Sequence, residues 1–338
     1  MKKIRRKIAA IALSLITITS LAACGGGAKE STSADGAAAS ITIGTLNLVN
    51  GDLIAQYEKW YEDELGVDVK LIKFDSGKDI NSAIASGSID IGQEGTSPAA
   101  LAISNDLDIQ VFWIGDIIGS AETLVARDGS GISSLADLKG KKVATPFAST
   151  AHYSLLNALK LEGVDQNDVE LLDLQPDDIF AAWTRGDIDA AYVWYPVLSS
   201  LLENGTAITD SEQLADKGIV TADTNVVRRE FAEANPELIT RFVELQLKAN
   251  DVINNDSTKA AQEISSILEI DEADAAEQIT QFQYLNKDQQ LEYLDGNFAE
   301  TLKNTADFLV EQKSIKSAPD LNTFKERVTS EYVKAASE

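Results

Sequence analysis

The sequence is poor in the residues on which many enzymes and disulfide-stabilised proteins depend. It has 338 residues but only one cysteine and one histidine. A lone cysteine excludes an internal disulfide and a cysteine-ligated metal site. The sequence also has no Walker A motif, no dinucleotide-binding glycine fingerprint, no metal-spaced cluster and no Ser-His-Asp pattern around His152. We therefore expect neither an enzyme nor a bound cofactor.

Basic residues are scarce as well, and several of them lie at the N-terminus. The whole chain has 29 Lys and Arg against 54 Asp and Glu. Residues 1–23 combine a basic start with an apolar run from Ile8 to Leu21, which is typical of a secretion signal. Without their five basic residues, 24 Lys and Arg face 54 acidic residues, a net charge of −30. Nucleic acids are therefore not expected partners.

The cysteine lies at the end of this signal. The sequence Leu21-Ala-Ala-Cys24 resembles the lipobox of bacterial lipoproteins, in which cleavage precedes a cysteine that then carries lipid. The resemblance implies an extracytoplasmic protein that is anchored to the cell membrane through Cys24. An ordinary signal-peptidase site is the alternative. Residues 24–40 are rich in Gly, Ala, Ser and Thr and predict a flexible tether.

Strand-like and helix-like segments alternate from residue 41 onward. The strand pattern at 41–45, for example, is followed by helical spacing at 53–65. The alternation restarts after residue 128, and from residue 236 the chain is almost entirely helical. Such alternation favours mostly parallel, doubly wound α/β sheets. About 300 residues exceed the usual size of one core, so we predict two α/β lobes and a helical C-terminal tail.

Three predicted strand-to-helix turns carry hydroxyl side chains. They contain Ser76, Thr96 with Ser97, and Ser149 with Thr150. The first N–H groups of a helix have no partner within it and attract anions, and a hydroxyl adds a further donor. Each turn alone is better explained by ordinary helix capping. Three of them at the carboxyl ends of doubly wound strands together favour one binding cleft.

Four more side chains are candidates for this cleft. Glu122 opens a predicted strand, and Asp223 interrupts an otherwise uncharged stretch. Trp183 and Trp194 combine a large apolar surface with a polar edge. A solvated strand end, a turn and the core are the ordinary explanations for these residues, and the sequence pattern alone leaves both possibilities open.

Several consecutive runs of residues resemble one known family. The runs are Lys73-Phe-Asp-Ser-Gly77, Phe147-Ala-Ser-Thr-Ala-His-Tyr-Ser-Leu-Leu156, Leu174-Gln-Pro176, Ala181-Ala-Trp-Thr-Arg-Gly-Asp-Ile-Asp189, Ala191-Tyr-Val-Trp194 and Thr209-Asp-Ser-Glu-Gln213. They resemble the taurine-binding members of the sulfonate/nitrate/taurine class of ABC importer binding proteins. The resemblance extends over residues 41–241 and is densest over 141–213, whereas the helical tail matches only loosely.

The resemblance implies a periplasmic-binding-protein type II-like fold, in which two α/β lobes clamp a ligand between them. Lobe I would comprise residues 41–126 and 224–338, and lobe II residues 127–223, with crossings near Arg127 and Thr224. The resemblance also implies ABC permease and ATPase subunits as partners of a monomeric receptor.

Placed on the matching positions, the resemblance implies how taurine would bind. The sulfonate would contact the three hydroxyl-bearing turns, with His152 and Tyr153. The ammonium would contact Asp223 with help from Glu122, and two tryptophans would enclose the methylene spacer. The implied ligand-binding residues are Ser76, Thr96, Ser97, Glu122, Ser149, Thr150, His152, Tyr153, Trp183, Trp194 and Asp223.

One loop departs from the family pattern. Leu46-Asn-Leu-Val-Asn-Gly51 is unlike the polar loop that the taurine-binding proteins carry after their first strand, and we expect it to line the rim of lobe I. Alkanesulfonates or another small anion, such as nitrate, are therefore alternative ligands. A sensor lipoprotein without a permease is an alternative from another class. So is an enzyme similar to those of thiamine-pyrimidine synthesis, although that family depends on a cysteine-rich motif that this chain lacks.

Overall fold

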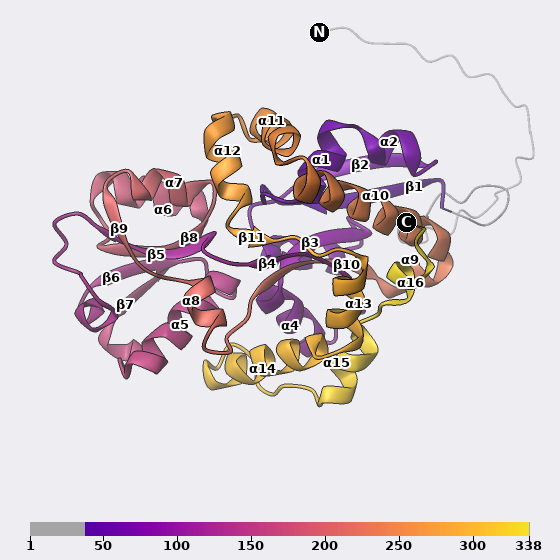
Figure 1. The fold of residues 1–338 in the computed structure, drawn as a ribbon. Helices are drawn as coiled ribbons and strands as arrows, with labels where there is room; N and C mark the ends of the chain where they lie inside the picture. The colour runs from indigo at the N-terminus through magenta and orange to yellow at the C-terminus, as the bar shows by residue number, and fades with distance from the viewer. Residues whose placement is uncertain (1–37, 338) are drawn as a thin grey trace, which may run out of the picture. The chain divides into compact units, whose positions relative to one another are not determined.

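Two mixed β-sheets with helices packed around them form the framework of the chain (Figure 1). The structure is a computed structural model and describes residues 38–337. The predicted secretion signal, Cys24 and most of the predicted tether lie outside the described residues. The predicted fold class, two α/β sheets with a helical C-terminal tail, is confirmed. Within residues 38–337, no helix combines the length and the apolar character that crossing a membrane requires.

The six-stranded sheet has the order β11-β4-β10-β3-β1-β2. Strands β1 to β4 run in one direction, whereas β10 is antiparallel to both of its neighbours and β11 is antiparallel to β4. The interior strand β3 is buried along its whole length, while the edge strand β2 exposes Asp68, Lys70 and Lys73, as a strand with a solvated face does. The strands are β1 Ser40–Thr45, β2 Asp68–Lys73, β3 Ile91–Gly95, β4 Ile109–Ile118, β10 Ala222–Arg228 and β11 Phe282–Gln283.

The five-stranded sheet has the order β7-β6-β8-β5-β9. Strands β6, β7 and β8 are parallel, and β5 is antiparallel to β8 and β9. Each sheet is thus mixed, and the carboxyl ends of its parallel strands share one edge. The strands are β5 Glu122–Arg127, β6 Lys142–Thr145, β7 Glu170–Asp173, β8 Ala190–Trp194 and β9 Gly205–Asp210.

The sheets divide the chain at places different from those expected. Strand β5 was expected in lobe I, but it pairs with β8 and β9 in the five-stranded sheet. Asp223 was expected in lobe II, but it lies on β10 of the six-stranded sheet. The chain therefore crosses between the sheets within residues 119–121 and 211–221 instead of near Arg127 and Thr224. An apolar pattern identifies a strand but not the sheet it joins, because its partners are distant in sequence.

The segment expected to be helical at 53–65 is divided into two helices at Lys59, which has a left-handed φ of 59°. In the helical tail, another helix ends at Gly296, where an added Cβ would collide with the carbonyl oxygen of Glu292. The α-helices are α1 Gly51–Tyr57, α2 Trp60–Glu64, α3 Gly77–Ala85, α4 Thr96–Ser104, α5 Thr150–Glu162, α6 Pro176–Arg185, α7 Val197–Leu202, α8 Ser211–Ala215, α9 Arg229–Ala234, α10 Pro236–Asn255, α11 Ser257–Leu268, α12 Glu272–Ile279, α13 Lys287–Asp295, α14 Phe298–Glu311, α15 Leu321–Arg327 and α16 Glu331–Ala335, and the 3₁₀ helices are η1 Leu135–Leu138 and η2 Gln166–Asp168.

The C-terminal helices pack against the elements that lead to the cavity described below. Helix α10 packs on α1, and its Phe242 ring stacks on Tyr61 with the ring centroids 5.3 Å apart. Helix α13 supports β4, because the Gln290 side chain accepts a hydrogen bond from the N–H of Ile114 and donates one to its carbonyl oxygen. Helix α14 packs against α4. The helical tail therefore packs with the six-stranded sheet and its helices.

Candidate functional site

A small cavity lies at the carboxyl ends of strands from both sheets. The space in it that the centre of a water molecule can reach is about 30 Å³. The segments at the ends of β1, β2 and β3 contribute from the six-stranded sheet, and those at the ends of β6 and β8 contribute from the other. Strand β10 adds Asp223. The lining residues are Leu46, Leu48, Ser76, Gly77, Lys78, Gly95, Pro98, Pro146, Phe147, Ala148, Ser149, Thr150, Trp194 and Asp223.

Three helix N-termini meet at this cavity. Helix α3 begins after Ser76, α4 after Gly95 and α5 after Ser149, and all three of these residues line the wall. Ser149 caps α5, since its Oγ accepts a hydrogen bond from the N–H of His152 at 3.1 Å. Ser76 does not cap α3; its hydroxyl donates to the Asp79 carboxylate at 2.8 Å. The unpaired N–H groups and the dipoles of these helices make this part of the wall suitable for an anion.

Two glycines allow these turns to approach one another. A Cβ on Gly77 would lie 2.5 Å from Pro98 Cγ, so only glycine lets the starts of α3 and α4 pack this closely. A Cβ on Gly95 would lie 2.7 Å from Thr150 Cγ2. Gly95 ends a strand of the six-stranded sheet and Thr150 begins the helix after β6, so this contact joins the two halves of the site.

Three buried carboxyl groups lie on the side of the cavity formed by β4, β5 and β10. Asp223 lines it, and Asp116 lies opposite Asp223 on the neighbouring strand β4. Glu122, on β5, accepts hydrogen bonds from the hydroxyls of Thr150 and Ser211. Both side-chain oxygens of Glu122 are thus held by neutral donors.

Burial governs the ionisation of all three acids. It raises the pKa of Asp223 to about 7 and that of Glu122 to about 8. Burial, together with the nearby charge of Asp223, raises the pKa of Asp116 well above its usual range. A cation in the cavity would stabilise the ionised forms and lower these pKa values. The acidic side of the site therefore favours a positively charged group.

Five of the eleven residues implied by the resemblance line the cavity, namely Ser76, Ser149, Thr150, Trp194 and Asp223. Three more are buried next to it. Glu122 reaches it through Thr150, as described above. Thr96 and Ser97 lie under the wall formed by Gly95 and Pro98, and their hydroxyls have no hydrogen-bond partner among the described residues.

The remaining three implied residues do not line the cavity. The His152 ring lies behind its wall, where it stacks on Phe147 with the centroids 4.4 Å apart and accepts a hydrogen bond from the N–H of Ala148. Tyr153 packs edge-to-face on Phe308 of α14. Trp183 belongs to the core of the five-stranded sheet, and its indole N–H donates to Asn204 at 2.6 Å. Residues on different faces of α5 and α6 cannot all point at one ligand.

Some lining residues were not among those implied. Leu46 and Leu48 come from the loop that departs from the family pattern and was expected at the rim. Lys78, in the first turn of α3, adds a positive charge to the anion-favouring wall. Asp116 was also missed, although a lone acid at the end of an apolar strand is the same signal that singled out Glu122.

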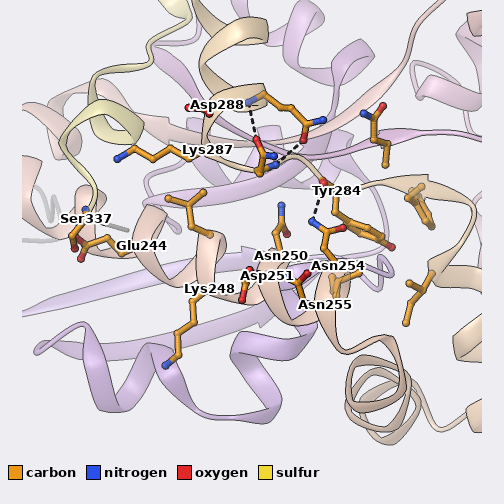
Figure 2. A pocket seen from close by; sticks show the side chains of 17 residues that line it. Glu244, Lys248, Asn250, Asp251, Asn254, Asn255, Tyr284, Lys287, Asp288 and Ser337 are labelled. Atoms are coloured by element: carbon orange, nitrogen blue, oxygen red, sulfur yellow. Dashed lines mark hydrogen bonds between the residues drawn. The ribbon is translucent and has the colours of Figure 1, made fainter.

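A wider groove lies on the six-stranded half, between α10 and residues 282–289 (Figure 2). Its polar side chains are largely paired with protein groups. Asn254 donates to the carbonyl oxygen of Tyr284, Lys287 donates to that of Ala336, and Lys248 forms an ion pair with Glu64. Neither the three helix N-termini nor the three buried acids described above line this groove. We therefore take the cavity between the sheets as the candidate site.

The raised pKa of Glu122 predicts a pH effect on stability. This group ionises near pH 4.5 in the unfolded chain and near pH 8 in the folded chain, so its stabilising effect is complete below about pH 4.5 and is lost as the pH rises through 8. Between about pH 5 and pH 8.5, the Tm of the ligand-free wild type should fall by about 2 °C or more beyond that of Glu122→Gln.

Thermal unfolding followed by circular dichroism measures this difference. The exposed Glu62→Gln variant is the control and should follow the wild type at every pH. Parallel curves for wild type and Glu122→Gln would contradict the prediction.

Comparison with known proteins agrees with this architecture. Residues 49–260 match the family described as NMT1/THI5 like. The chain is 38% identical over 302 residues to the taurine-binding periplasmic protein of Escherichia coli K12, an alignment that covers 88% of this chain and 93% of that protein.

Solved structures share the fold. The alkanesulfonate-binding protein SsuA of Xanthomonas axonopodis pv. citri, bound to MOPS, superposes with a TM-score of 0.71 at 22% identity, covering 84% of this chain and 96% of that one. The aliphatic sulphonate binding protein SsuA of Escherichia coli gives a TM-score of 0.70 at 22% identity, over 86% and 92% of the two chains. The resemblance inferred from the sequence is thus confirmed, and the chain belongs to the NMT1/THI5-like family, with a taurine-binding periplasmic protein among its relatives.

Proposed function

We propose that the chain is the extracytoplasmic substrate-binding protein of an ABC importer, and that it binds taurine or a closely related aminosulfonate between its two sheets. The observation that carries the proposal is the composition of the cavity, which combines helix N-termini with the buried carboxyl group of Asp223. The relationship to a protein named for taurine binding supports it.

The helix N-termini suit the sulfonate end of such a ligand. A sulfonate remains ionised and offers three oxygen acceptors, which the unpaired N–H groups of α3 and α5 can satisfy. Ser149 and Lys78 line the same wall and supply a hydroxyl and an ammonium group. Because both halves of the site contribute donors, an anion bound here would favour the closed arrangement.

Asp223 suits the amine end. Its carboxyl group is about 95% buried and would pair with an ammonium, and such a pair stabilises binding because neither charge is then left alone out of water. The side chains of Leu46, Leu48 and Trp194 add apolar surface for a short methylene spacer.

Alkanesulfonates and nitrate are the alternative ligands. Either would use the helix N-termini, but neither carries a cation, so the carboxyl group of Asp223 would stay buried without a positively charged partner. This cost favours an aminosulfonate over both.

We further propose binding without catalysis, ABC permease and ATPase subunits as partners, and a monomeric receptor anchored to the membrane by lipid on Cys24. A relative named as a putative ABC transporter periplasmic binding protein supports the transport role, and the lipobox-like sequence around Cys24 supports the anchor. A sensor lipoprotein that binds the same ligand would have this site but no permease.

Replacing Asp223 tests the amine contact. Asp223→Asn keeps the shape of the side chain but removes the charge, so the affinity for taurine should fall by about 100-fold or more, whereas that for propane-1-sulfonate should change by less than about threefold. Isothermal titration calorimetry measures both ligands. The exposed Asp63→Asn variant is the control and should bind both ligands as the wild type does. Taurine affinity within about twofold of wild type in Asp223→Asn would remove the proposed role.

Replacing Gly95 tests the contact between the two halves. An added methyl group would meet Thr150 Cγ2, so Gly95→Ala should hold β3 and α5 apart and weaken taurine binding by about tenfold or more. The Tm of the ligand-free variant should stay close to that of the wild type, since an open arrangement relieves the clash. Unchanged affinity would show that binding does not bring these residues together.

Replacing Cys24 tests the anchor. The full-length Cys24→Ala chain should lack the mass of the lipid and should leave the membrane fraction. Intact-mass spectrometry and cell fractionation measure these changes. If the wild type is already free of lipid and of the membrane, the proposed anchor is wrong, whereas the proposed ligand site is unaffected.

A further inference from the structure

Two buried carboxyl groups face each other at the acidic side of the cavity. Asp116 on β4 lies opposite Asp223 on β10, next to a shift in the register of the two strands. Asp223 lines the cavity, whereas Asp116 lies behind it with no exposed surface. A ligand therefore meets Asp223 first, with Asp116 as the support of that residue.

Asp116 is held in place by the loop that departs from the family pattern. Asn50 Nδ2 donates to Asp116 Oδ2 at 3.2 Å. Asn50 Oδ1 accepts from the N–H of Asp52, which caps α1 and fixes the orientation of the amide. The other oxygen of Asp116, Oδ1, has no hydrogen-bond donor among the described residues. A buried oxygen of this kind is satisfied if it carries a proton and donates it.

Among the described residues, the ionisable groups that act on the pair are another acid and a tyrosine. Glu122 approaches from β5 and disfavours a second negative charge on Asp116. Tyr284, just after β11, lies close enough to feel the charge of both acids, and its hydroxyl already donates to the carbonyl oxygen of Val49 at 2.6 Å. Two adjacent carboxyls in such a site cannot both ionise cheaply, and one proton shared between them is the usual result.

We propose that Asp116 and Asp223 share one proton and present a single negative charge to the ammonium group of the ligand, with Asp116 as a positioning residue that donates its O–H to Asp223. This inference rests on the proposed function, because the ammonium belongs to the proposed ligand. It explains the unpartnered oxygen of Asp116, and it gives the loop residue Asn50 a role in ligand choice. A pair with one charge matches a ligand that carries one amine.

Two substitutions separate a proton donor from a packing residue. In Asp116→Asn the amide can still donate to Asp223, whereas Asp116→Leu has a similar volume and no donor. Calorimetric titration with taurine and with propane-1-sulfonate, from about pH 6 to pH 8.5, measures the effect. In the wild type, taurine affinity should rise with pH until Asp223 is ionised, near pH 7, and then level off.

In Asp116→Leu the pH at which taurine affinity levels off should rise by about one unit. Near pH 6.5, taurine should therefore bind this variant about tenfold more weakly than the wild type. Asp116→Asn should stay within about threefold of the wild type without a shift of the profile, and propane-1-sulfonate should bind all three chains alike. Three results would overturn the inference. Both variants could lose the same taurine affinity, a variant could lose affinity equally for taurine and propane-1-sulfonate, or the pH dependence of taurine affinity could be unshifted in Asp116→Leu.

The wild-type titration separates this inference from the proposed function. A wild type that binds no taurine overturns both, whereas a wild type that binds taurine with the same pH profile as Asp116→Leu overturns the inference alone. If Asp116→Leu does not fold, ¹³C NMR of the Asp carboxyl groups in the wild type tests instead whether one of them keeps its proton. One carboxyl that stays protonated to about pH 8 is expected, and ionisation of all Asp carboxyls by about pH 6 would contradict the shared proton.

Discussion

The carboxyl group of Asp223 is out of water and must be partnered, and this constraint organises the site. Neutral hydroxyls and amides hold the acids around it, so the protein leaves the charge for a ligand to neutralise. An ammonium group can do so, but an ammonium alone would not use the rest of the cavity. The ligand that fits the whole site carries both signs of charge a short distance apart.

The doubly wound sheets explain why the same small cavity also has an anion-binding part. Strands that end at one edge place the N-termini of the following helices there, and those N-termini attract anions. The antiparallel strand β10 then brings Asp223 between β3 and β4 to the same edge. The anion-binding and cation-binding parts thus come from the topology, while Gly77 and Gly95 set how closely the turns approach.

The sequence was enough to predict the fold class and the turns after β2, β3 and β6, because strand-to-helix alternation and hydroxyl residues are local signals. It was not enough to place β5 or Asp223 in the correct sheet, since strand partners are distant along the chain. His152, Tyr153 and Trp183 have residue types that suit a ligand, but their helices turn them toward Phe147, Phe308 and Asn204. Asp116 was missed because its importance comes from its partner on the neighbouring strand.

In the proposed site, one cavity needs both charges of its ligand. The most direct measurement is calorimetric titration of the wild-type chain near pH 7.5 with taurine and with its two halves, ethanesulfonate and ethylamine. The account predicts that taurine binds at micromolar concentration or tighter, and that each half molecule binds about 100-fold or more weakly. Ethanesulfonate that binds as tightly as taurine would contradict the account.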